Sequence, residues 1–124
     1  MKSYYMKSEK CPVEQALQVI GGKWKIPIIH HLNEKPHRFG KLKSRLTKVT
    51  QQMLSKQLKE MENDGLVQRT VLSVMPPSVE YSLTDFGKSA IPVLQSLYSW
   101  STHHDSKITK LIKKNHSGQI QITN

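Results

Sequence analysis

The sequence predicts a mainly helical protein with a small antiparallel β-hairpin, and three observations indicate this fold class. Apolar residues recur at helical spacing through most of the chain. Between residues 67 and 83 the spacing changes to the alternation of a strand, with β-branched and aromatic side chains. Glycines stand where periodic segments stop, at Gly21-Gly22 and at Gly65. A chain of 124 residues is long enough for one domain with a modest core.

The composition narrows the class of partner. The chain carries 19 Lys and Arg against 9 Asp and Glu, a net charge of +10, which favours a polyanion such as DNA, RNA or an acidic membrane. Its apolar runs are shorter than the roughly 18 residues that a membrane span needs. The start, MKSYYMKSEKCPVE, has no apolar signal-peptide core. We therefore expect a cytoplasmic protein that does not insert into membranes.

Three segments are expected along the chain. Residues 1–10 form a polar arm, residues 11–114 form the folded domain, and residues 115–124 form a tail. A single cysteine excludes an intrachain disulfide and a cysteine-rich zinc site.

Two helices are expected to open the domain. The first begins at Cys11-Pro12, because proline suits the first helical position, and ends at Gly21-Gly22. The second runs from about Trp24 to Leu32 and is apolar enough to be mostly buried. Arg38-Phe39 could then form one short strand of a small sheet.

A short helix, a short turn and a longer helix follow. The short helix is Gly40 to Leu46 and the turn is Thr47 to Val49. The longer helix lies in the stretch Thr50 to Leu66, with Thr50 as its N-cap and Gly65 as its stop signal. This order, with a polar outer face on the longer helix, is typical of a helix-turn-helix.

The longer helix has two unlike faces. Leu54, Leu58 and Met61 form a core-facing stripe. The opposite face carries amides, a hydroxyl and two cations but no carboxylate, in Gln52, Ser55, Lys56, Lys59 and Asn63. Such a face suits DNA phosphates and base edges. The alternative is an ordinary amphipathic helix with a chance run of polar residues.

The remaining segments predict a wing and a long last helix. Strands at Val67–Ser73 and Val79–Leu83, joined by a stiff loop, form the wing. Thr84-Asp85 caps a helix whose apolar stripe passes Trp100 and extends toward residues 108–112, with a kink at Pro92. Little of the chain is left to cover its far half, so we expect a helix of a second subunit to do so.

The chain resembles the HxlR-type transcriptional regulators, winged helix-turn-helix proteins allied to the MarR group. The resemblance covers roughly Cys11 to Trp100 and rests on the motifs CPVEQALQVIGGKWK, HRFGKLK, TQQMLSKQLKEMENDGLVQR and PPSVEYSLTDFGK. It implies a homodimer joined by its terminal helices and bound to a pseudo-palindromic double-stranded DNA operator. The half-sites would then lie about one helical turn, roughly 34–36 Å, apart.

The resemblance also implies roles for single residues. The base-reading positions would be Gln51, Gln52, Ser55 and Lys56. The DNA backbone would be held by Lys41, Lys43, Thr50, Lys59 and Arg69. Many relatives carry a cation at the positions of Gln52 and Ser78. Both are neutral here, so we expect a different operator and a wing that contacts the backbone weakly.

Cys11 is the candidate sensor. The resemblance implies a redox or electrophile sensor at this position, and a helix N-terminus with Lys7 and Lys10 nearby favours the reactive thiolate. The modification would be a bond between the two Cys11 thiols of a dimer, a mixed disulfide with a small thiol, or alkylation by an electrophile. The alternative is a small buried residue at the start of the helix.

Other classes of function find less support. His30-His31 and His103-His104 with Asp105 suggest a metal, but adjacent helical residues point about 100° apart, so neither pair is expected to chelate one. The sequence shows no catalytic constellation and no cofactor motif, so we do not expect an enzyme. A winged-helix protein–protein adaptor and a non-specific nucleic-acid-binding protein remain as alternatives.

Overall fold

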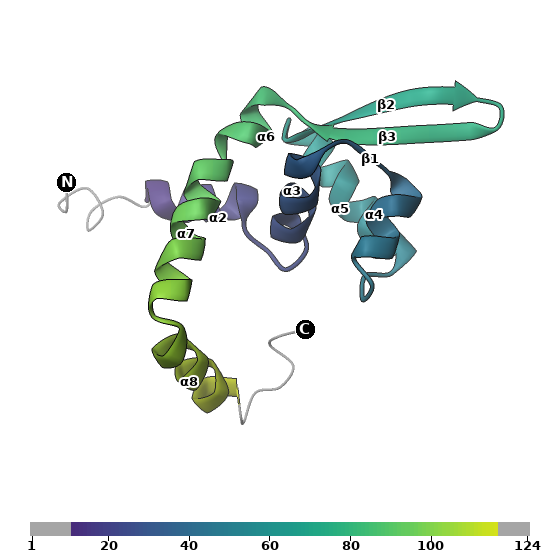
Figure 1. The fold of residues 1–124 in the computed structure, drawn as a ribbon. Helices are drawn as coiled ribbons and strands as arrows, with labels where there is room; N and C mark the ends of the chain where they lie inside the picture. The colour runs from purple at the N-terminus through teal and green to yellow at the C-terminus, as the bar shows by residue number, and fades with distance from the viewer. Residues whose placement is uncertain (1–10, 117–124) are drawn as a thin grey trace. The chain divides into compact units, whose positions relative to one another are not determined.

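A computed structural model describes residues 11–116; the predicted arm over residues 1–10 and residues 117–124 lie outside the described part. The elements, labelled in Figure 1, are α2 (Pro12–Ile20), α3 (Lys25–Glu34), β1 (His37–Arg38), α4 (Phe39–Arg45), α5 (Gln51–Asn63), β2 (Val67–Val74), β3 (Pro77–Leu83), α6 (Asp85–Ser89), α7 (Ile91–His103) and α8 (Asp105–His116). The chain forms two compact units, which divide after Ile91. This confirms the mainly helical fold with a small antiparallel sheet.

The sheet has the order β1-β3-β2, and both pairings are antiparallel. The hairpin of β2 and β3 projects beyond α4 and α5 as a wing (Figure 1). Its strands are longer than predicted, because Ser73 pairs with Ser78 and Val74 with Pro77. Proline is tolerated as the first residue of a strand, where its missing N–H costs little. The predicted five-residue loop is therefore wrong, and only Met75 and Pro76 separate the strands.

The core of the first unit confirms the stripe predicted on α5. Leu54, Leu58 and Met61 are fully buried. They share the core with residues of α3, α4, β2, the turn before α5 and the link after it, namely Ile28, Ile29, Leu42, Val49, Leu66 and Val67. A core drawn from so many elements fixes the orientation of α5, because interiors pack as densely as organic crystals.

The C-terminal end of α5 is tied to the start of α6. Gly65 has a φ of +79°, a left-handed conformation that favours glycine, and it stops the helix as predicted. The Thr84 hydroxyl lies within hydrogen-bond distance of the Gly65 and Leu66 carbonyl oxygens and accepts from the Gly87 N–H at 3.0 Å. A Cβ at Gly87 would collide with the Leu66 carbonyl oxygen. These contacts hold both ends of the wing beside α5.

The last helix differs from the prediction. One long helix with a kink at Pro92 was expected, but the segment is three helices, broken at Ala90 and His104. Pro92 is the second residue of α7, where a proline costs no helical hydrogen bond, so the chain ends α6 and restarts instead of bending. At the far end, α8 continues to His116, two residues past the predicted end of the domain.

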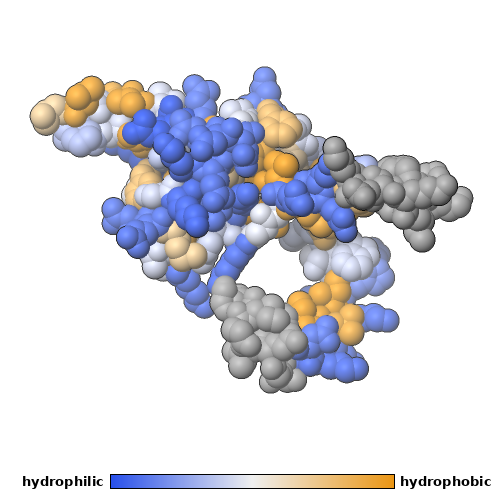
Figure 2. Space-filling model, turned by 180° about the vertical axis from the view of Figure 1, so that it is seen from behind, coloured by the Kyte–Doolittle hydropathy of each residue, from blue (hydrophilic) through white to orange (hydrophobic). Residues whose placement is uncertain are grey.

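The second unit exposes much of its apolar surface. None of the residues of α7 is buried. Its exposed large side chains include Val93, Leu97, Tyr98 and Trp100, and those of α8 include Leu111 and Ile112. Figure 2 shows hydrophobic side chains gathered on α8 beside hydrophilic ones. Within residues 11–116, no helix combines the length and the hydropathy that crossing a bilayer would require.

Candidate nucleic-acid interface

Helices α4 and α5 and the turn between them form the predicted helix-turn-helix. Leu46 and Val49 of the turn are buried, and the Val49 N–H donates to the Leu46 carbonyl at 3.1 Å. The Thr50 hydroxyl accepts from the Met53 N–H at 3.0 Å, which confirms the predicted N-cap. The start of α5 is therefore fixed by the Thr50 cap and by the buried side chains of the turn before it.

The outer face of α5 is polar and open. The residues predicted to read bases are all exposed, and so are the next two on that face: Gln51, Gln52, Ser55, Lys56, Lys59 and Asn63. The one acidic side chain of α5 with a salt bridge, Glu60, lies on another side, where Lys25 Nζ of α3 is 3.9 Å from its Oε1. Residues 51–59 therefore present amide, hydroxyl and ammonium groups suited to a polyanion without an acidic side chain, and the exposed Glu62 follows in the last turn.

The residues predicted to contact the DNA backbone lie on three elements. Lys41 and Lys43 belong to α4, with Lys41 exposed and Lys43 half-buried. Lys59 lies on α5, Thr50 caps that helix, and Arg69 lies exposed on β2, paired in register with Tyr81. The fold thus spreads these cations along the helix-turn-helix and the base of the wing.

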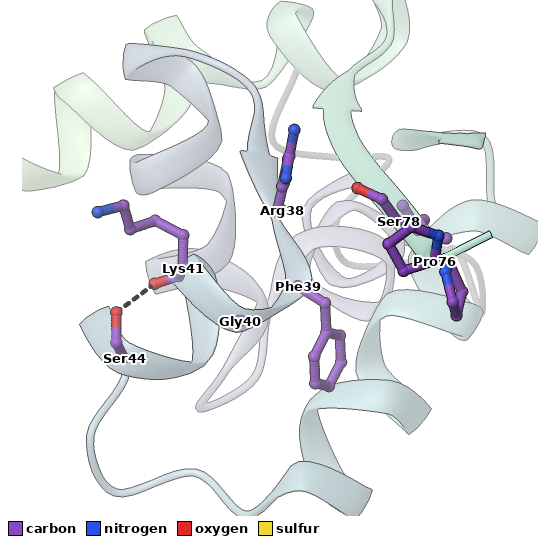
Figure 3. Close-up of a pocket in the computed structure, with 9 residues that line it drawn as sticks. Arg38, Phe39, Gly40, Lys41, Ser44, Pro76 and Ser78 are labelled. Carbon is purple, nitrogen blue, oxygen red and sulfur yellow. Dashed lines mark hydrogen bonds between the residues drawn. The ribbon is translucent and has the colours of Figure 1, made fainter. Parts of the chain in front are cut away.

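A hollow between the start of α4 and the wing joins two of these elements (Figure 3). Arg38 and Lys41 are among its lining residues, with the Lys41 side chain directed away from Ser78 in Figure 3, and the Ser44 hydroxyl donates to the Lys41 carbonyl at 2.8 Å. On the wing side, Ser78 contributes a buried hydroxyl oxygen without a hydrogen-bond partner among the described residues. Buried polar groups normally have partners, so this hydroxyl is a candidate ligand contact.

Sequence reasoning found only part of this hollow. It named Lys41, and it discounted Ser78 because the position lacks a cation. Arg38 lies in the HRFGKLK motif but was assigned only to a strand. The hollow is formed by residues about forty positions apart in the chain, and a local sequence pattern cannot predict that such residues lie together.

The tip of the wing is apolar. Val74 and Met75 are largely exposed, and Figure 2 shows hydrophobic side chains at the far end of the hairpin. Apolar side chains contact the minor groove in several architectural DNA-binding proteins. The neutral wing predicted from the sequence is therefore apolar at its end and polar at its base.

Two further groups lie outside this set of residues. Cys11 is half-exposed at the N-cap of α2, and its carbonyl accepts from the Gln15 N–H at 2.9 Å. At the end of α3, burial and then the neighbouring His30 lower the pKa of His31. A sensing role for Cys11 stays a prediction.

Comparison with known proteins agrees with this geometry. Residues 19–109 match the family model described as HxlR-like helix-turn-helix. The chain is 44% identical over 103 residues to YdeP of Bacillus subtilis strain 168, an uncharacterized HTH-type transcriptional regulator; the match covers 83% of this chain and 80% of YdeP.

Solved structures show the same likeness. The redox regulator HypR in its reduced form has a TM-score of 0.76 and 39% identity, over 80% of this chain and 98% of HypR. The reduced form of the transcriptional regulator YodB from Bacillus subtilis has a TM-score of 0.66 and 35% identity, over 71% of this chain and 86% of YodB. The fold and the family thus rest on both sequence and structure.

Proposed function

This chain belongs to the HxlR-like helix-turn-helix family and is a transcriptional regulator of that type, and we propose that it binds a specific DNA operator as a homodimer. The observation that carries the proposal is the exposed polar surface of residues 51–59 of α5, which has amides, a hydroxyl and two lysines but no acidic residue, on a helix held by a fully buried apolar stripe. A rigid helix with such a face fits the major groove of B-DNA, which admits an α-helix.

Base reading is assigned to the first half of α5. Gln51 and Gln52 are the residues best suited to adenine, because a glutamine amide pairs with N6 and N7 of that base. Lys56 suits the O6 and N7 acceptors of guanine, and Ser55 accepts several bases. An operator rich in adenine at the contacted positions follows from this set.

Backbone contacts are assigned to the cations around the helix-turn-helix and to the hollow at the wing. Arg38 and Lys41 would neutralise a phosphate there, and the Ser78 hydroxyl would donate to one of its oxygens. Lys43, Lys59 and Arg69 would extend the contact along the strand. These contacts fix the register of α5 in the groove without reading sequence.

Dimerisation is assigned to the terminal helices. The uncovered apolar side chains of α7 support this, since soluble proteins rarely expose large contiguous apolar patches. A two-fold dimer would present two copies of α5 to half-sites about one helical turn apart.

The direct test is anisotropy of a labelled duplex from immediately upstream of the gene, compared with a scrambled duplex of equal length at physiological salt and with thiols reduced. We expect the native duplex to bind about 10³-fold or more tighter. Gln52→Ala should remove much of this preference, whereas Lys41→Ala should weaken both duplexes alike and reduce the salt slope by about one. Equal binding of both duplexes by the unsubstituted protein would contradict sequence-specific regulation at this site.

Redox or electrophile sensing through Cys11 is proposed as the regulatory input. Similarity to HypR, which is a redox regulator, and the half-exposed position of Cys11 at a helix start support it. A thiolate that attacks a small disulfide forms a mixed disulfide and releases one thiol, and the new bulk would turn one subunit against the other. Treatment with a small disulfide such as oxidised glutathione should then weaken operator binding. The variant Cys11→Ser should not show this response. An unchanged response in Cys11→Ser would exclude the sensor.

A further inference from the structure

The last turn of α3 gathers three potential metal ligands. His30, His31 and Glu34 each offer one ligand atom, and these atoms lie within 4.8 Å of one another. We propose that this cluster binds a divalent transition-metal ion, with Zn²⁺ as the representative ion. Glu34 follows His30 by four residues and His31 by three, so it lies on the same side of the helix as both imidazoles. The sequence argument considered only pairs of adjacent histidines and missed this third member.

A second observation comes from the start of β1. The imidazole of His37 is only 2% exposed, and its Nδ1 lies 2.7 Å from the Lys35 carbonyl oxygen. Because a carbonyl can only accept, Nδ1 must be the donor, which leaves Nε2 with a free lone pair. That Nε2 is buried without a hydrogen-bond partner among the described residues. A carbonyl that orients an imidazole through its other nitrogen is the usual support of a metal-binding histidine.

His31 and His37 adjoin each other at this site. Their ring centroids are 6.2 Å apart, and Nδ1 of His31 is also buried without a partner within the described part of the chain. Two neighbouring buried imidazole nitrogens without partners are unusual, since buried polar groups are normally satisfied. With the His31 proton on Nε2, both nitrogens carry lone pairs that a nearby cation would satisfy.

The ligand set fits zinc chemistry. Zn²⁺ takes imidazole nitrogen at about 2.0–2.1 Å and carboxylate oxygen at about 2.0–2.2 Å, usually in a tetrahedron. The present separations therefore have to shorten by about 1–1.5 Å, judged from that geometry. His30 and Glu34 are exposed and can rotate to do so. The fourth position is open to water or to His37.

Charged groups of both signs face the cluster. Arg45 acts on His31 and opposes a bound cation, while the Glu34 carboxylate acts on the same ring more strongly and attracts one. An ion held here would join the end of α3 to β1, whose Arg38 lines the hollow at the wing. It would therefore stabilise the first unit by mass action and act close to the proposed DNA surface.

The test is a calorimetric titration of the full, tag-free, reduced chain with Zn²⁺ alone. We expect one ion per chain. The variants His30→Ala and Glu34→Gln should each bind at least about tenfold more weakly, because each removes an exposed ligand without opening the core. The matched control, a chain with both His103→Ala and His104→Ala, removes the other adjacent histidine pair and should bind as the unsubstituted protein does.

A spectroscopic readout separates this site from the thiol. Co²⁺ bound here should give the visible absorption of a tetrahedral nitrogen and oxygen site, and it should persist in Cys11→Ser. Circular dichroism of the metal-free variants checks that each one folds. Unchanged Zn²⁺ affinity in folded His30→Ala and Glu34→Gln, loss of binding in the His103 and His104 variant, or no Zn²⁺ uptake by the unsubstituted protein would each overturn the proposal.

Discussion

Helices α5 and α7 have the same length and opposite surroundings. Each has 13 residues. In α5 the apolar residues Leu54, Leu58 and Met61 are 0% exposed, whereas in α7 no residue is buried, with Leu97 at 46% and Trp100 at 62% exposure. α7 contains no Lys, Arg, Asp or Glu, so the helix with fewer charges is the one left open to solvent.

This difference assigns a different task to each helix. The apolar stripe of α5 is covered by its own chain, which leaves the polar face free and rigidly placed for a ligand. The apolar side chains of α7 are not covered by their own chain, so a second chain is the partner that would remove them from water. Under the proposed function, α5 would serve recognition and α7 would serve assembly.

Among the substitutions that test this difference, Leu58→Ala is expected to have the largest effect on stability. Removing a fully buried leucine side chain leaves a cavity, and the free energy of unfolding should fall by about 2–5 kcal/mol. Chemical denaturation should show this loss at every protein concentration, because the contacts lie within one chain. A loss below about 1 kcal/mol would show that the stripe of α5 packs loosely.

Trp100→Ala should affect assembly rather than the fold of the first unit. A large aromatic residue at an interface contributes about 2 kcal/mol or more, so the dimer dissociation constant should rise about 30-fold or more. Sedimentation measurements over a range of concentrations would report this change. Gln95→Ala, at an exposed polar position of the same helix, is the control. Equal dimer affinity in Trp100→Ala and in the unsubstituted protein would remove α7 from the interface.

Thr50→Ala should have the smallest effect. Its hydroxyl caps α5, and loss of such a cap costs about 1 kcal/mol. Thr102→Ala in α7 is the matched control, because the Thr102 hydroxyl bonds to the Tyr98 and Ser99 carbonyls within the helix and caps nothing. Thermal unfolding of both variants compares them. If Thr102→Ala lowered the stability as much as Thr50→Ala, the effect of Thr50→Ala could not be attributed to the loss of the helix cap.

The features predicted correctly from the sequence are those with a local signal. The stripe at Leu54, Leu58 and Met61 follows from helical periodicity, and Thr50 and Gly65 mark the helix ends by their own backbone chemistry. The alternation at Val79, Tyr81 and Leu83 placed β3.

The features that were missed depend on distant residues. The attachment of α6 to the end of α5, where the Thr84 hydroxyl meets the Gly65 and Leu66 carbonyl oxygens, joins residues about twenty positions apart and leaves no trace in the periodicity. The hollow at Arg38 and Ser78 and the approach of His31 to His37 likewise require the folded arrangement of α3, α4 and the wing. The exposure of apolar side chains on α7 could be predicted, because the chain has too few residues left to cover that helix.

The mass of the protein–DNA complex tests the division between α5 and α7 most directly. Sedimentation of the upstream duplex with the reduced protein, at physiological salt, gives the number of chains bound per duplex. The account predicts two chains per specific site, with Trp100→Ala shifting the complex to one weakly bound chain. One chain per duplex with full preference for the native sequence, in the unsubstituted protein, would contradict it.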